Sequence, residues 1–299
     1  MLATLVIWAA VALSGAAALA YEICWSRALV VPLGNSSDAA AVVLAGFMLG
    51  IAVGARVGGG LAERVRSPLR SYALLELLLG CYAIAAPKLL GLLGGVTVGQ
   101  GDVIATGLGI VTRYTGALVL IVVPGLAMGA TLPLLIRALT RPGAPLGLRI
   151  GILYGANTVG AALGAFVVGF FAIATFGLWG SSALAAGASL TAAALAMIAS
   201  RAMPEARQAT GADADSDSEA EADTEAEAAT DTEADAANGT PRRVAPKRVP
   251  TAATGRIALV ATFVSGFAML GCELLWARVL TFVFGHDTYA FASLLAFVL

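Results

Sequence analysis

Charged residues are scarce in this sequence. Lys, Arg, Asp and Glu together make up 12% of its 299 residues, about half of their share in a typical soluble domain. Twelve of the 19 acidic residues lie from Glu205 to Asp235, so only seven are left for the rest of the chain. No basic stripe with interleaved aromatic residues is present, so we expect no nucleic-acid partner.

Residue patterns that carry enzyme chemistry are also missing. His286 is the single histidine, and Cys24, Cys81 and Cys272 lie in apolar runs without metal-ligand spacing or a disulfide framework. The glycines at 58–60 lack the strand–turn–helix context of a phosphate-binding loop. We therefore predict no catalytic residue, no metal site and no cofactor within this sequence.

Long apolar runs take up most of the chain, in which 59% of the residues are hydrophobic. A helix needs about 20 apolar residues to cross a ~30 Å hydrocarbon core, and these runs lack the alternation of barrel strands. Runs of this kind lie at 2–33, 39–61, 71–93, 114–136, 150–175, 180–200 and 257–284, and an eighth begins near 288. We predict an all-α polytopic membrane protein, and a piece of a longer one, because a helix that ends at Leu299 is too short to span.

Basic residues concentrate in alternate loops. They cluster at 64–70, 137–149 and 201–256, whereas the turns near Gly34 and Gly177 have none. Loops rich in Lys and Arg stay on the cytoplasmic side of a membrane. The pattern predicts a multi-pass protein of the plasma membrane with its N-terminus in the cytoplasm.

The segment 202–255 differs from the rest of the chain. It consists of Ala, Asp, Glu and Thr followed by a stretch of Pro, Arg and Lys, and it has too little apolar surface to form a core. We interpret it as a disordered spacer, with a binding tail as the alternative. The sequence thus predicts a first transmembrane unit of six helices at 1–201, a disordered acidic cytoplasmic linker at 202–255, and the first helices of a second, truncated unit at 256–299.

An internal repeat supports two helical units. Residues 14–48 align with 265–299 without gaps at a constant offset of 251, and 13 of the 35 positions are identical. The identical pairs include Ser14 with Ser265, Gly15 with Gly266, Glu22 with Glu273, Trp25 with Trp276, and Arg27 with Arg278. Six spans separate the two starts, so both copies share one orientation. A parallel duplication of a six-helix unit is the plan of major facilitator transporters.

Ionisable residues inside the spans form the candidate functional site, because such residues usually face the protein interior or a wet cavity. They are Glu22, Arg27, Glu273 and Arg278, and Asn157 lies in the fifth span. Glu22 comes about 30 Å along its helix, near the outer face. The four charged residues line a site for a charged solute or form an ion-pair lock between helices. For Asn157 the alternatives are an interhelical hydrogen bond and solute contact.

Two further residues are expected near the membrane surfaces. Trp25 and its repeat Trp276 fit an interfacial belt of aromatic side chains. Glu76 comes only a few residues into the third span, so pairing with Arg70 or Arg56 at the cytoplasmic surface is expected.

Glycines recur every four residues in the second span and every four or five residues in the fifth. The second span carries Gly46, Gly50, Gly54 and Gly58, and the fifth carries Gly151, Gly155, Gly160 and Gly164. A stripe of small residues lets a neighbouring helix approach closely, so we interpret both stripes as helix-packing surfaces.

Three stretches resemble membrane-bound spermidine synthase-like proteins, in which a facilitator-like membrane part is fused to a synthase. They are residues 14–27 (SGAAALAYEICWSR), 129–133 (GATLP) and 151–164 (GILYGANTVGAALG). The resemblance implies a soluble Rossmann-like domain beyond the C-terminus, which would transfer an aminopropyl group from decarboxylated S-adenosylmethionine to putrescine. Its glycine-rich loop is absent from these residues, so no catalytic residue is carried over. Residues 60–64 (GLAER) separately resemble the loop motif of the major facilitator superfamily, with Glu63 where Asp is usual.

Three hypotheses follow. The first is the membrane domain of a spermidine synthase-like protein, which anchors or supplies the synthase domain. The second is a facilitator-type transporter of a small solute, with a cationic polyamine as the example. The third is a membrane scaffold. In each case the lipid bilayer is the principal partner.

Overall fold

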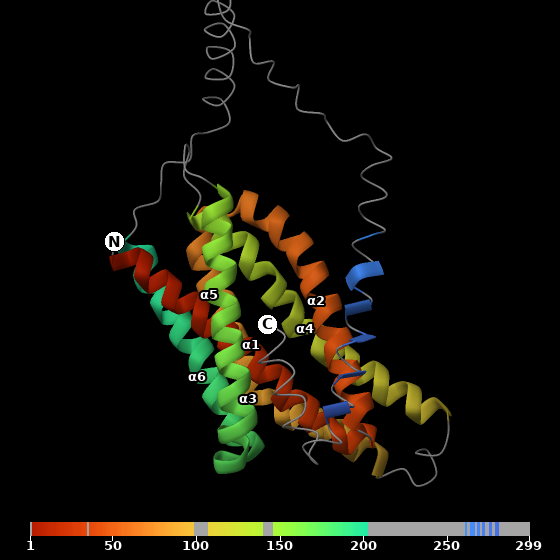
Figure 1. The fold of residues 1–299 in the computed structure, drawn as a ribbon. Helices are drawn as coiled ribbons and strands as arrows, with labels where there is room; N and C mark the ends of the chain where they lie inside the picture. The colour runs from red at the N-terminus through yellow and green to blue at the C-terminus, as the bar shows by residue number, and fades with distance from the viewer. Residues whose placement is uncertain are drawn as a thin grey trace, which may run out of the picture. The chain divides into compact units, whose positions relative to one another are not determined.

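The computed structural model describes residues 2–34, 36–98, 107–139 and 146–202, and separate helical residues between 261 and 280. All regular elements of this described part are helices (Figure 1). They are α1 (Leu2–Leu33), α2 (Ser36–Arg64), α3 (Pro68–Val98), α4 (Gly107–Leu139), α5 (Leu146–Val167), the π-helix η2 (Val168–Ala172) and α6 (Ile173–Ala202). The predicted linker lies outside the described residues, as do Glu273 and Arg278.

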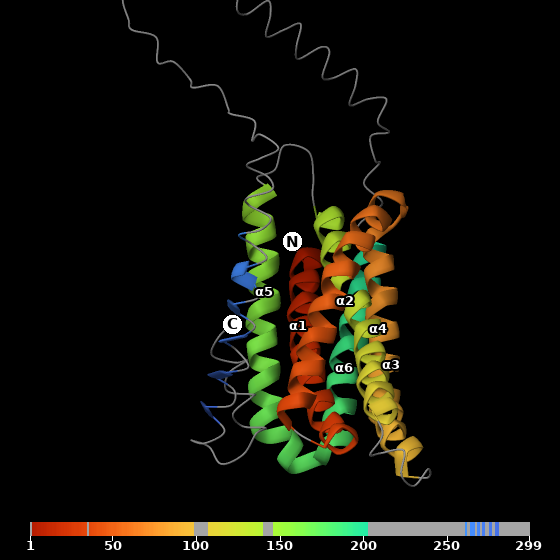
Figure 2. The ribbon, with the colours of Figure 1, turned by 90° about the vertical axis from the view of Figure 1, so that its right-hand side faces the viewer.

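The chain reverses direction at Gly177. The helical run from Ile150 to Ala202 has 53 residues, and as one straight helix it would be about 80 Å long. Gly177 interrupts it with φ 66° and ψ −174°, a conformation that glycine adopts at low cost. In Figure 2 the chain turns at the foot of α5 and returns as α6. The predicted spans 150–175 and 180–200 are therefore two separate passes.

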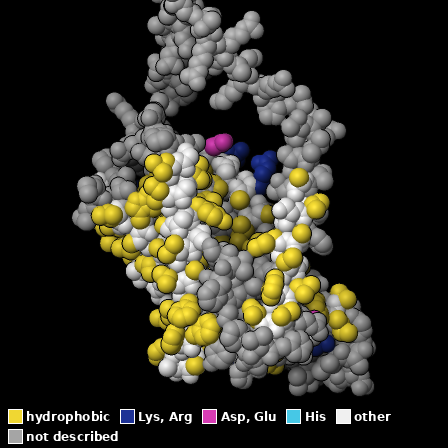
Figure 3. All heavy atoms as spheres, in the orientation of Figure 1, with side chains coloured by type: hydrophobic (Ala, Val, Ile, Leu, Met, Phe, Trp, Pro, Cys, Tyr) yellow, Lys and Arg dark blue, Asp and Glu magenta, His cyan; other side chains and the backbone are white. Residues whose placement is uncertain are grey.

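The outer surface of the helices is apolar. Five helical runs are long and apolar enough to cross a membrane, and the one that contains Gly177 makes two passes. Large hydrophobic side chains such as Val57, Leu78, Val119 and Phe171 are exposed, and Figure 3 shows such side chains spread over the visible face of the described helices. Helices that are apolar on their outer faces are typical of membrane spans. The prediction of a helical, multi-pass, membrane-embedded protein is thus confirmed at this level.

The helices pack in a definite set of pairs. α1 lies against α5 and α6, α3 lies against α6 and α4, and α2 lies chiefly against α4. One buried cluster centres on Tyr21, Trp25 and Phe47, and a second includes Ile7 and Tyr72. α1 contacts each of the other five α-helices and is therefore the central helix of the bundle.

Glycines make the closest helix contacts. Those at 46, 50, 54 and 58 face α4: a Cβ on Gly50 would lie 2.7 Å from the Cα of Gly125. Gly160 and Gly164 face the backbone of α1 at Ala12 and Ala16. By contrast, a Cβ on Gly155, as on Gly151, would meet no atom within 4 Å. The α5 stripe is therefore a packing surface over its second half only.

Candidate functional site

Five polar side chains meet inside the bundle. They are Ser14 and Tyr21 of α1, Tyr72 and Glu76 of α3, and Ser189 of α6, and we call them the Glu76 cluster. The buried residues of α3 recur every three or four positions, which brings Glu76 onto the same face as Tyr72 and Leu79. The side chain of Glu76 is only 1% exposed. The expected surface pairing of Glu76 with Arg70 or Arg56 is therefore wrong, and both arginines are exposed.

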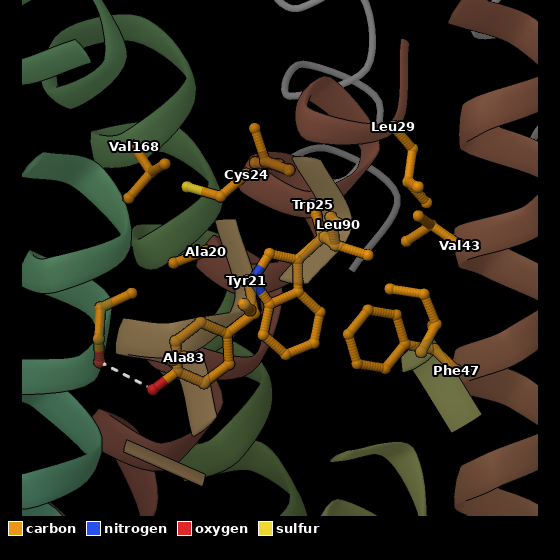
Figure 4. Close-up of a cluster of buried hydrophobic side chains, with 14 of the residues drawn as sticks. Ala20, Tyr21, Cys24, Trp25, Leu29, Val43, Phe47, Ala83, Leu90 and Val168 are labelled. Carbon is orange, nitrogen blue, oxygen red and sulfur yellow. Dashed lines mark hydrogen bonds between the residues drawn. The ribbon is translucent and has the colours of Figure 1, made fainter. Parts of the chain in front are cut away.

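Hydroxyl groups surround the carboxyl. The Ser14 hydroxyl donates to Glu76 Oε1, and the hydroxyls of Tyr72 and Ser189 lie against the same carboxyl. The Tyr21 hydroxyl is 3.0 Å from Ser189 Oγ and 3.1 Å from the carbonyl oxygen of Ala185, and Figure 4 shows it reaching α6. The cluster therefore joins three helices through polar contacts.

The cluster lies at membrane depth. Glu76 comes eight residues after Pro68, the first residue of α3, which is about 12 Å along the helix axis. Ser14 comes twelve residues after Leu2 in α1, about 18 Å along that axis. Both residues therefore lie well inside helices that are longer than a ~30 Å hydrocarbon core. Ionisable groups at this depth mark functional sites by default.

Glu22 is also buried, with 5% of its surface exposed. It comes eleven residues before Leu33, where α1 ends, so it lies about 16 Å from that end of the helix. Measured from Leu2, the other end of α1, Glu22 is twenty residues along the helix, about 30 Å, so its position near the outer face stays a prediction. Arg27 is exposed, so the structure does not place Arg27 in the interior with Glu22. Their repeat partners lie outside the described residues.

Asn157 lies at the close contact between α5 and α1. A Cβ on Gly15 would come within 3.0 Å of Asn157 Oδ1, and Gly15 follows Ser14 directly in the sequence. The position agrees with the interhelical alternative, and it sets Asn157 one residue from the Glu76 cluster.

Trp25 belongs to the core and not to an interfacial belt. It is fully buried and is stacked between Tyr21 at 5.1 Å and Phe47 at 5.5 Å, measured between ring centroids (Figure 4). The ring of Tyr82 meets it edge-on at 5.6 Å. The belt prediction for Trp25 is wrong because its helix is enclosed by neighbouring helices at this level.

The buried charge of the described residues is acidic only. Glu22 and Glu76 are buried, whereas every described Lys and Arg side chain is partly or fully exposed. Such an interior has the sign that favours a cation.

Comparisons with known proteins add no relative. No family model, no curated protein and no solved structure matches this chain. The site is therefore defined by its geometry alone.

Proposed function

We propose that this chain is the membrane domain of a facilitator-type transporter and that its solute is a small organic cation. The observation that carries the proposal is the pairing of the helices. Transporters of this type contain two three-helix repeats of inverted topology in each six-helix half. In such a half, α1 corresponds to α4, α2 to α5, and α3 to α6.

Five of the observed pairs fit this correspondence, whereas the contact of α1 with α3 has no comparable counterpart between α4 and α6. When each helix is replaced by its counterpart in the other repeat, the pair α1–α5 becomes α4–α2 and the pair α1–α6 becomes α4–α3. The pair α3–α6 is unchanged. All five of these pairs are in contact. The glycine stripes fit as well, because they lie on α2 and α5, which are equivalent under the exchange. A simple membrane anchor needs no such relation between its helices.

The charge of the interior supports a cationic solute. Two buried carboxyl groups without a buried basic residue among the described side chains would attract a cation and repel an anion. The resemblance of residues 14–27 to spermidine synthase-like proteins suggests polyamines as the solute class to test first.

Uptake of labelled putrescine and spermidine into proteoliposomes tests the proposal. We expect the full-length protein to take up one of them, and we expect Glu22→Gln together with Glu273→Gln to abolish uptake while the protein stays folded. Glu63→Gln is the matched control, because Glu63 is exposed at the end of α2. Absence of uptake by the parent protein, or unchanged uptake by the double variant, would contradict the proposal.

A second proposal rests on the sequence resemblance. The helices would anchor or supply an aminopropyltransferase domain that follows them in the full-length protein. In that case the full-length protein transfers the aminopropyl group, and Glu22→Gln leaves this activity in detergent solution unchanged. No transferase activity in the full-length protein would end this second proposal.

The location in the plasma membrane and the cytoplasmic N-terminus are also proposals. Reporter fusions at Gly95 and Asp223 test the orientation. We expect an external signal at Gly95 and a cytoplasmic one at Asp223, and a cytoplasmic signal at Gly95 would contradict this topology.

A further inference from the structure

One atom of the Glu76 cluster is buried without a hydrogen-bond partner, namely Glu76 Oε2. The other carboxyl oxygen accepts from Ser14. The Tyr72 hydroxyl donates to the carbonyl oxygen of Ala10, and the Tyr21 hydroxyl is hydrogen-bonded to the carbonyl oxygen of Ala185 and to Ser189 Oγ. A buried carboxylate needs several donors or a basic partner to offset its lost hydration. The hydroxyls of Tyr72 and Ser189 also lie against this carboxyl, but none is hydrogen-bonded to Oε2. Hydroxyl contacts without a basic partner leave a negative charge at this position only partly compensated.

No basic group in the described bundle supplies the missing compensation. The groups that face Glu76 are hydroxyls: Ser14 and Tyr21 from α1, Tyr72 from α3 itself, and Ser189 from α6. The third helix that packs against α3 is α4. Its arginines, Arg113 and Arg137, lie near its two ends. Glu76 is thus not half of a structural ion pair with any of these neighbours.

We propose that Glu76 binds a transferable proton at Oε2, and that this proton is the coupling ion of the transporter. The inference deepens the proposed function and rests on it. In the binding step a proton from water forms an O–H bond with a lone pair of Oε2, and the carboxylate becomes a neutral carboxyl group. Release breaks the same bond and returns the proton to water, and no electron is transferred.

The packing of the cluster selects a proton over the organic solute. Glu76 is 1% exposed, and three hydroxyl groups already lie against its carboxyl. A solute with several carbon atoms would have to displace these groups, whereas a proton needs no cavity. The hydroxyl oxygens of Ser189 and Tyr72 lie against the same carboxyl and have lone pairs that can accept from the new O–H group after a small side-chain movement, because neither is hydrogen-bonded to Oε2 before the proton binds. Ser14 is a positioning residue that holds the other carboxyl oxygen.

Helix α1 connects the proton site with the solute site. Ser14 contacts Glu76, and Glu22 lies eight residues further along α1, about 12 Å along the axis. A rigid movement of α1 that accompanies solute binding at Glu22 therefore changes the contact between Ser14 and Glu76. The contact provides a direct link between solute movement and proton release.

Infrared difference spectroscopy of the full-length protein in liposomes tests proton binding without a solute. We expect a C=O band of a protonated carboxyl that disappears as the pH is raised and is absent from Glu76→Gln. Glu63→Gln should keep the band. Ser14→Ala should move it to higher frequency, because the C=O group loses a hydrogen-bond donor. A spectrum that Glu76→Gln and Ser14→Ala both leave unchanged overturns the proposal.

A transport measurement tests the coupling separately. We expect Glu76→Gln to abolish accumulation driven by a pH gradient and to retain exchange of labelled for unlabelled spermidine. Accumulation that still follows the pH gradient in Glu76→Gln overturns the coupling role. If the parent protein takes up no solute, the proposed function fails, while the infrared result still decides whether Glu76 binds a proton. Thermal unfolding of each variant in detergent shows whether it is folded.

Discussion

The helix pairs α1–α5 and α2–α4 use the same packing device for different purposes. In both, glycines on one helix meet the backbone of the other, Gly160 at Ala12 and Gly54 at Leu126. The α2–α4 contact is apolar beside the glycines, where Ile121 and Ala130 lie, and its polar pair, Tyr114 with Asp38, lies near the start of α2. The α1–α5 contact instead borders Ser14 and includes Asn157. In the proposed inverted repeat, the two equivalent contacts thus carry different polar groups, and only the α1–α5 contact borders the buried Glu76 cluster.

The largest expected loss of stability comes from placing a larger side chain in each of the two glycine contacts. Gly160→Val and Gly54→Val each place side-chain atoms against partner backbone, so each should destabilise the fold by about 3 kcal/mol or more. Unfolding in detergent measures this. The matched control is Gly155→Ala on α5, where a Cβ meets nothing within 4 Å, and it should change stability by less than about 1 kcal/mol. A large effect for one pair only would show that the two contacts are not equivalent.

These contacts show what the sequence could predict. The spans, the turns at Gly34 and Gly177, and the glycine stripe of α2 follow from apolar length and residue spacing, which are local properties. The burial of Trp25 does not follow, because a lipid-facing surface and a helix-facing surface are both apolar in a membrane. Without that contrast, hydropathy cannot tell the core side of α1 from the lipid side.

Glu76 was predictable in part. Tyr72, Glu76 and Leu79 share one helical face, and an ionisable residue within an apolar span usually faces the protein interior. Distance from the end of the span suggested a surface position instead, and the helix phase is the better guide. Its partners Ser14 and Ser189 come from other helices, so their meeting with Glu76 depends on the tertiary packing of three helices.

An intermediate loss of stability is expected at Trp25, where the α1–α5 pair meets the α2–α4 pair. Trp25 of α1 stacks on Phe47 of α2, and Trp25→Ala removes a fully buried ring, which costs about 3 kcal/mol through lost packing. Trp179→Ala is the control, since Trp179 is 57% exposed and should change stability by less than about 1 kcal/mol. The difference between the two unfolding midpoints checks the prediction, and equal midpoints would contradict the placement of Trp25 in the core.

The smallest expected losses of stability come from removing single hydroxyl groups. One of these hydroxyls bonds to a neighbouring helix, and the other bonds within its own helix. Tyr21→Phe removes a hydroxyl that links α1 to Ala185 and Ser189 of α6, and it should cost about 1 kcal/mol. Thr131→Val removes a hydroxyl of α4 that bonds to Met128 in its own helix, at 2.6 Å, and it should cost less, because no helix pair loses a contact. Unfolding of both variants under one set of detergent conditions gives the comparison. Equal losses would mean that the polar side of α1 contributes no more to stability than the apolar side of the bundle, and the Glu76 cluster would then be a site maintained for its chemistry alone.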